Sequence, residues 1–165
     1  MAKENFKTPD FLAIAEKLKG DMRRHAKVYC LQWFDDSFQN QGFTDASFTE
    51  WKKRKNDKDS GRAILIDTTF LRKSLDVLDE TETTITFGTH VPYASVHNNG
   101  ERVRAVQNVR AHHRTRDGQR HQVQAHARKM DTKFPKRQFI GESKLMMDGL
   151  EKWLSTQIKQ RFKNN

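Results

Sequence analysis

A run of basic and polar residues around Asp117-Gly118 constrains the fold of this chain more than any other segment. The Asp-Gly pair favours the type I′ turn of a two-residue β-hairpin, in which Arg116 faces Gln119. In that register the residues of Val109–Arg128 alternate between two faces, and neither face is apolar enough to lie on a core. The sequence therefore predicts a two-stranded ribbon outside the core. Such a ribbon is marginal in water, so we expect it to be mobile or to gain order from a partner.

Most of the net charge lies in the same region. Residues 101–137 hold eleven lysines and arginines and only three acidic residues, a net charge of +8 out of +10 for all 165 residues. A local basic excess is typical of a surface that meets phosphate groups or an acidic partner. The candidate contacts for a partner protein or for DNA are Arg110, His112, Arg114, Arg116, Arg120, His121 and Arg137.

Two amphipathic helices are predicted near the ends of the chain. The run Thr8-Pro9-Asp10 is typical of a helix start, with an N-cap threonine and a proline in the first turn. Apolar residues then recur at helical spacing to about Phe38, and Cys30 within this stripe is predicted to be a buried apolar residue. A second helix is expected after Gly141 or Ser143. Its stripe, which we expect to face the core or another subunit, is Leu145, Met146, Leu150, Trp153, Leu154, Ile158 and Phe162.

Strand-like patterns lie between the two helices. Ser74–Asp79 and Thr83–Thr89 flank a turn at residues 80–82, which predicts an antiparallel pair. Residues 39–61 are polar and predict irregular structure with a mobile loop, and Tyr93–His97 predicts a helical turn. We therefore expect an α+β fold, in which long N-terminal and C-terminal helices pack a central antiparallel sheet and a basic β-hairpin protrudes.

Length and cysteine content indicate a simple organisation. A chain of 165 residues is expected to form a single domain, residues 1–165, with the basic hairpin inserted at about 101–133. The first ten residues lack the apolar run of a signal peptide, and no stretch of about 18 apolar residues predicts a membrane span. Cys30 is the only cysteine, which excludes an intramolecular disulfide and fits a reducing compartment such as a bacterial cytoplasm.

The sequence offers little for catalysis. Four of the seven histidines lie in the basic hairpin, but Asp117 is the only acid near them and the guanidinium groups there repel cations. We therefore expect no metal and no cofactor. The run VHNNG at residues 96–100 contains the His-Asn pair of HNH-type nucleases without further ligands at suitable spacing, which makes a metal-dependent nuclease the weakest alternative. Non-specific nucleic-acid binding needs only dense arginine and lysine and is the main alternative.

Three segments carry motifs in a fixed order. Residues 67–75 (DTTFLRKSL) are similar to TGxLRxSI, residues 87–100 (FGTHVPYASVHNNG) to GTxVxYAxxHxxG, and residues 134–141 (FPKRQFIG) to PxRxFLG. Their order before a terminal helix resembles the phage virion morphogenesis family, the tail-completion or head–tail joining proteins of Mu-like phages. Thr69 stands where that family usually has glycine, and the basic segment between the last two motifs is longer than expected.

The resemblance implies a non-enzymatic virion protein that acts in tail completion or head–tail joining as a ring subunit. Its partners would be further copies of itself and other phage tail or neck proteins, with non-specific contact to phage DNA as a further expectation. It would be made in the host cytoplasm and end in the tail or neck of the virion. Structural roles are expected for Gly88, Tyr93, His97, Gly100, Phe139 and Gly141. Gly88 and Gly100 are expected to adopt backbone angles closed to other residues, and Tyr93 and Phe139 to anchor the core.

Overall fold

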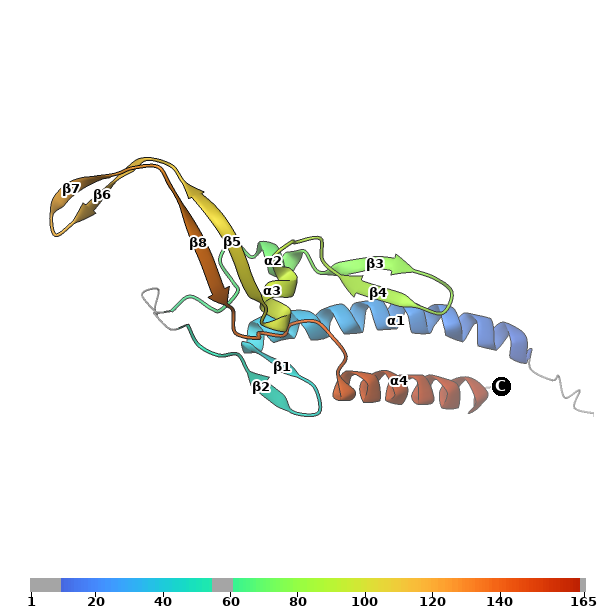
Figure 1. Ribbon diagram of the computed structural model, residues 1–165. Helices are drawn as coiled ribbons and strands as arrows, with labels where there is room; N and C mark the ends of the chain where they lie inside the picture. The colour runs from blue at the N-terminus through green and yellow to red at the C-terminus, as the bar shows by residue number, and fades with distance from the viewer. Residues whose placement is uncertain (1–9, 55–60, 164–165) are drawn as a thin grey trace, which may run out of the picture. The chain divides into compact units, whose positions relative to one another are not determined.

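The computed structural model describes residues 10–54 and 61–163, and it confirms the α+β class (Figure 1). The chain divides into two compact units, Met1–Val91 with Gln138–Asn165 and Pro92–Arg137. Within the described residues, the strands form four separate two-stranded antiparallel ladders, where the sequence predicted one central sheet. The strands are three to eight residues long. A two-stranded ladder of this length is marginally stable alone in water, so its stability depends on the segments that pack against it.

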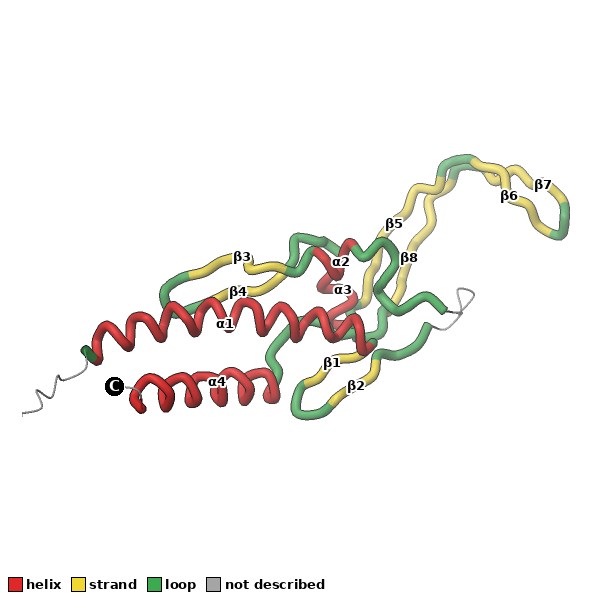
Figure 2. Tube along the Cα trace, turned by 180° about the vertical axis from the view of Figure 1, so that it is seen from behind, coloured by secondary structure: helices red, strands yellow, loops and turns green. Residues whose placement is uncertain are grey.

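The first unit is organised by α1 (Phe11–Asn40), which Figure 2 shows as one unbroken helix. The side chain of Asp10 caps its start by accepting a hydrogen bond from the backbone N–H of Ala13 at 3.0 Å. The predicted cap, Thr8, lies with Pro9 outside the described residues, and the prediction is wrong because Asp10 is the cap. The helix ends at Asn40 and is capped by Gln41, whose φ of 58° is left-handed.

A short hairpin of β1 (Gly42–Thr44) and β2 (Phe48–Glu50) follows directly. Irregular structure was predicted here, and that prediction is wrong for these residues; part of the predicted mobile loop, residues 55–60, lies outside the described residues. Phe43, within β1, and Trp51, directly after β2, are both buried. Burial of these two side chains stabilises strands that are too short to show a pattern in the sequence.

The second ladder, β3 (Asp76–Glu80) with β4 (Ile85–Gly88), pairs as predicted. Its turn lies at residues 81–84, where the sequence indicated 80–82, because Glu80 still pairs with Ile85. The side chains of Ile85 and Phe87 point from β4 to the core cluster around α1. The short α2 (Phe70–Lys73) precedes this ladder.

The C-terminal helix α4 (Lys144–Lys163) packs beside α1. Its start is capped by Ser143, whose Oγ accepts a hydrogen bond from the N–H of Met146 at 3.2 Å. Of the two predicted starts, Ser143 is therefore confirmed as the residue that precedes the helix. The buried residues of the core cluster are Ala26, Cys30, Phe34, Phe43, Met146 and Leu150. Cys30 is thus buried as predicted, and burial raises the pKa of its thiol.

The second unit consists of α3 (Ala94–Asn99) and one long ribbon. The ribbon has an inner ladder of β5 (Arg102–Val109) with β8 (His126–Lys133) and an outer ladder of β6 (His112–Arg116) with β7 (Gln119–Val123). Figure 1 shows that the ribbon bends between the two ladders. The helical turn predicted at Tyr93–His97 is confirmed by α3, although the helix runs to Asn99.

Candidate functional site

The outer end of the ribbon is built by its turn. Asp117 and Gly118 have φ values of 52° and 78°, which are both positive as a type I′ turn requires. Arg116 pairs with Gln119 and Arg114 with His121, and the predicted register is confirmed. The handedness of this turn matches the twist of the two strands, so a local sequence signal fixes which side chains share a face.

The residues between the two ladders, here called the joint, are Arg110, Ala111, Gln124 and Ala125. None of these four is paired in a described ladder, but the register is the same on both sides. The ring of His112 donates a hydrogen bond from Nδ1 to the carbonyl oxygen of Arg110 at 3.0 Å, and His126 donates likewise to Gln124 at 2.9 Å. The two histidines occupy equivalent places on the two strands, and each binds a carbonyl that lacks a ladder partner.

The inner ladder holds several of its cations in place with its own side chains. Arg102 donates two hydrogen bonds to the carboxylate of Asp131, at 2.5 and 2.7 Å, and Arg104 lies 3.5 Å from the same group. Arg128 donates two hydrogen bonds to the side-chain oxygen of Gln107. These contacts orient guanidinium groups that are otherwise exposed, and they support a ladder with little apolar surface.

The tip of the ribbon, defined as residues 110–125, differs from the inner ladder. All of its residues are exposed except Val123, which is partly buried. It contains four arginines and one acid, Asp117, and only Arg116 approaches that acid, at 3.6 Å and with both side chains largely exposed. Six of the seven predicted contact residues lie in the tip: Arg110, His112, Arg114, Arg116, Arg120 and His121.

The base of the ribbon joins α3 to residues 134–137. The N–H of Arg137 donates to the carbonyl oxygen of His97 at 2.8 Å, and the N–H of Phe134 donates to Glu101 at 3.0 Å. The ring of His97 lies edge-on to Phe134, with the centroids 5.4 Å apart. Burial, together with the nearby guanidinium of Arg137, lowers the pKa of His97, so its neutral form is favoured. His97 thus contributes its ring and its backbone carbonyl to the base of the ribbon.

Gly100 closes α3 in a conformation that requires glycine. Its φ is 72°, and a Cβ at this position would lie 2.6 Å from the backbone nitrogen of Lys136. The same expectation for Gly88 is wrong because its φ is not positive. Gly88 instead lies close to the side chain of Leu78, whose Cδ1 atom would be 2.5 Å from a Cβ at this position. Gly141 has a φ of 147° and lies just before the cap of α4.

Three further predicted residues are placed by the structure, and one was misjudged. Phe139 is fully buried against Phe38, whose ring in turn contacts Trp51, so its role as a core anchor is confirmed. Tyr93 is 44% exposed and contacts His97 edge-on, so the expectation that it anchors the core is wrong. Arg137 is only 8% exposed, which separates it from the six exposed contact candidates of the tip.

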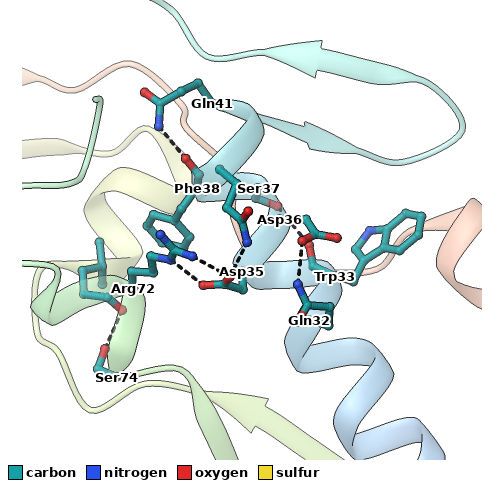
Figure 3. Close-up of polar contacts among 11 residues, drawn as sticks. Gln32, Trp33, Asp35, Asp36, Ser37, Phe38, Gln41, Arg72 and Ser74 are labelled. Atoms are coloured by element: carbon teal, nitrogen blue, oxygen red, sulfur yellow. Dashed lines mark hydrogen bonds and ion pairs between the residues drawn. The ribbon is translucent and has the colours of Figure 1, made fainter. Parts of the chain in front are cut away.

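A polar cluster that the sequence did not reveal connects α2 to the C-terminal half of α1 (Figure 3). Arg72 donates two hydrogen bonds to the carboxylate of Asp35, at 2.5 and 2.7 Å, and these bonds lower the pKa of Asp35. Gln39 also donates to this carboxylate at 2.8 Å. Arg72 belongs to the first motif and Asp35 lies outside all three, so no local pattern indicated the pair. The cluster fixes the first motif on α1.

The first unit also carries an apolar groove of about 560 Å³ between α1, β4 and α4. Apolar side chains dominate its lining, among them Met22, Phe87, Met147 and Leu154. Met147 is 49% exposed, so part of this lining faces solvent. A groove of this kind is typical of a surface that binds another apolar group.

The described residues, 10–54 and 61–163, contain neither a candidate metal site nor a candidate membrane span. No group of three or more His, Cys, Asp or Glu side chains there is arranged to hold a metal ion. No helix in these ranges is both long enough and apolar enough to span a membrane.

The fold and the candidate site together define an α+β protein that carries a basic ribbon and an apolar groove. The model of the phage virion morphogenesis family matches residues 37–163, about three quarters of the chain, and the chain belongs to that family. The matched range includes all three motifs and reaches from the end of α1 to the last residue of α4. No curated protein and no solved structure gives a significant match. Family membership indicates a role in phage assembly.

Proposed function

We propose that this protein is a non-enzymatic subunit that acts in tail completion or head–tail joining and is located in the tail or neck of the virion. The observation that carries the proposal is the family match, which includes residues of both compact units. The partners proposed are other phage tail or neck proteins and further copies of the same chain. Assembly proteins of this kind act through the surfaces they bury against neighbours, so the mechanism is the formation of interfaces.

The first unit offers surfaces for contact between copies. The groove is an apolar hollow, and the exposed aromatic side chains of Phe48 and Phe70, 50% and 60% exposed, are apolar projections on the same unit. A projection of one copy in the groove of the next is a contact between two different surfaces. Contacts of that type repeat around an axis and close into a ring when the rotation per subunit divides a full turn. We therefore propose a homo-oligomeric ring.

The assembly role is tested in a phage that encodes this chain. Deletion of the gene is expected to leave separate heads and tails or incomplete tails, and wild-type protein supplied from a plasmid is expected to restore infectious particles. Cryo-EM of complete virions is expected to show density for the chain at the head–tail junction or the head-proximal tail end. Normal infectious particles from the deletion, with no such density in the wild type, would contradict the proposal.

The ring is tested by light scattering of purified variants. Met147→Glu introduces a charge into the groove and is expected to lower the mass of the assembly. Thr156→Glu adds the same charge at an exposed position of α4 that does not line the groove, and it is expected to leave the mass unchanged. Equal masses for the wild type and Met147→Glu would show that the groove does not join subunits.

The non-enzymatic part is tested with duplex DNA and added Mg²⁺, Mn²⁺ or Zn²⁺. We expect no cleavage by the wild type. Cleavage that is lost in both His97→Ala and His112→Ala, with folding retained, would replace the proposal with a metal-dependent nuclease.

A further inference from the structure

The arginines of the tip have little to bind within their own ribbon. Arg110, Arg114 and Arg120 form no ion pair among the described residues, and Arg116 has only the weak contact to Asp117. In the inner ladder, by contrast, Asp131 and Gln107 hold three guanidinium groups. Unpaired cations at this density repel each other, and an anionic partner relieves that repulsion.

The cations of the tip lie on both faces of the ribbon. Arg114 and Arg116 are two residues apart on β6 and share one face, about 6.8 Å apart along the strand. Arg120 on β7 pairs with Thr115 and therefore lies on the other face. A flat acidic surface would bind one face and leave the other in water. A groove with phosphates along both walls would meet both faces at once, and the major groove of duplex DNA admits a two-stranded ribbon.

The tip also lacks the side chains on which protein interfaces depend. It contains no phenylalanine, tyrosine or tryptophan, and its apolar residues are limited to Ala111, Val123 and Ala125. Protein–protein interfaces have a core of aromatic and other apolar side chains, while protein–DNA interfaces are polar and strongly cationic. Gln119, Gln122 and Gln124 add exposed amides, which are able to donate hydrogen bonds to phosphate or base edges. The composition therefore favours nucleic acid over an acidic protein.

We propose that the tip binds duplex DNA by insertion into a groove, with its four arginines on the phosphate backbone and without sequence preference. His112 and His126 each bind a backbone carbonyl of the joint, where the ladder is interrupted. These two hydrogen bonds position the tip relative to the inner ladder. This binding site is distinct from the groove proposed to join subunits, and it does not depend on that groove.

The proposal predicts how steeply the affinity for DNA falls with salt concentration. Each phosphate neutralised on duplex DNA contributes about −0.9 to the slope of log affinity against log salt, so four arginines contribute about −3.6. An increase from 50 to 200 mM NaCl then weakens binding about 150-fold. The measurement is fluorescence anisotropy of full-length protein with two labelled duplexes of unrelated sequence, over a series of salt concentrations.

Two matched variants locate the site. The quadruple replacement of the tip arginines with glutamine, at positions 110, 114, 116 and 120, is expected to remove about 3.6 from the slope and to weaken binding at 50 mM NaCl at least 100-fold. The control replaces Lys17, Lys144, Lys152 and Lys159, four exposed lysines of α1 and α4, with glutamine and has the same net charge. It is expected to keep the wild-type slope to within about 1. Circular dichroism confirms that both variants are folded.

Further measurements distinguish binding of duplex DNA from binding of other anions. Arg114→Lys keeps the charge and is expected to keep the slope, and a single strand of the same length is expected to bind more weakly than the duplex. The proposal is overturned if the tip variant binds as the wild type does, or if the lysine control loses as much of the slope. It is also overturned if polyglutamate or the single strand competes as well as the duplex, because the surface would then recognise charge alone. A deletion phage tests the assembly role separately from all of these outcomes.

Discussion

Thr69→Gly is expected to stabilise the protein, because Thr69 has a backbone conformation that suits glycine. Its φ is 61° and its ψ is 2°, and its side chain makes no capping hydrogen bond at the start of α2. A left-handed conformation costs an L-residue about 1–2 kcal/mol, and a β-branched residue lies at the upper end of that range. Glycine avoids this cost but loses about 0.4–1 kcal/mol through the greater freedom of its unfolded chain. The expected net gain is about 1 kcal/mol, or a rise in Tm of about 2–4 °C at this chain length.

The assay is urea unfolding monitored by tryptophan fluorescence, with thermal unfolding as a second measurement. Thr68→Gly is the neighbouring control, because Thr68 has no positive φ and its Oγ1 accepts a hydrogen bond from the N–H of Phe70 at 3.4 Å. The same substitution there is expected to destabilise by about 1 kcal/mol. The two neighbouring substitutions should therefore shift the urea midpoint in opposite directions. A loss of stability for Thr69→Gly similar to that of Thr68→Gly would refute the reasoning. At this position the chain has threonine where the family pattern of the first motif has glycine.

The remaining predictions concern the cap, the base and the polar cluster. Ser143→Ala is expected to lower the free energy of unfolding by about 1 kcal/mol in urea, because α4 loses its N-cap. Gly100→Ala is expected to cost at least about 2 kcal/mol in the same assay, because a left-handed residue gains a Cβ against the backbone of Lys136. Asp35→Asn is expected to cost about 1 kcal/mol at pH 7, since the ion pair with Arg72 is partly exposed. The folded pKa of Asp35 is lowered, so this stabilisation is complete above the ordinary pKa of an aspartate, about 3.9, and is lost as the pH falls through the folded value. The difference between wild type and Asp35→Asn should therefore shrink in urea titrations below about pH 4, and a constant difference down to pH 2 would contradict it.

The sequence pattern predicted the helices and strands whose conformation is determined by residues close to one another in the chain. Helical spacing of apolar residues indicated α1 and α4, and alternation around a turn indicated the ladder of β3 and β4. The hairpin of β1 and β2 was missed, because each strand has three residues and the burial of Phe43 and Trp51 that stabilises it comes from distant segments. The helix start was misplaced for a related reason. Threonine and aspartate both cap helices well, and only the observed hydrogen bond to Ala13 selects Asp10.

The basic ribbon shows how far the sequence alone determined this protein. The Asp117-Gly118 turn set the register, and the register set which arginines share a face, because both follow from the backbone conformation of two residues and the two-residue period of a strand. Tertiary structure decided the rest. It buried Arg137, exposed Tyr93 and brought Arg72 onto Asp35 across 37 positions of sequence. Burial and long-range pairing depend on which segments pack together, and that is a property of the whole fold that no local pattern contains.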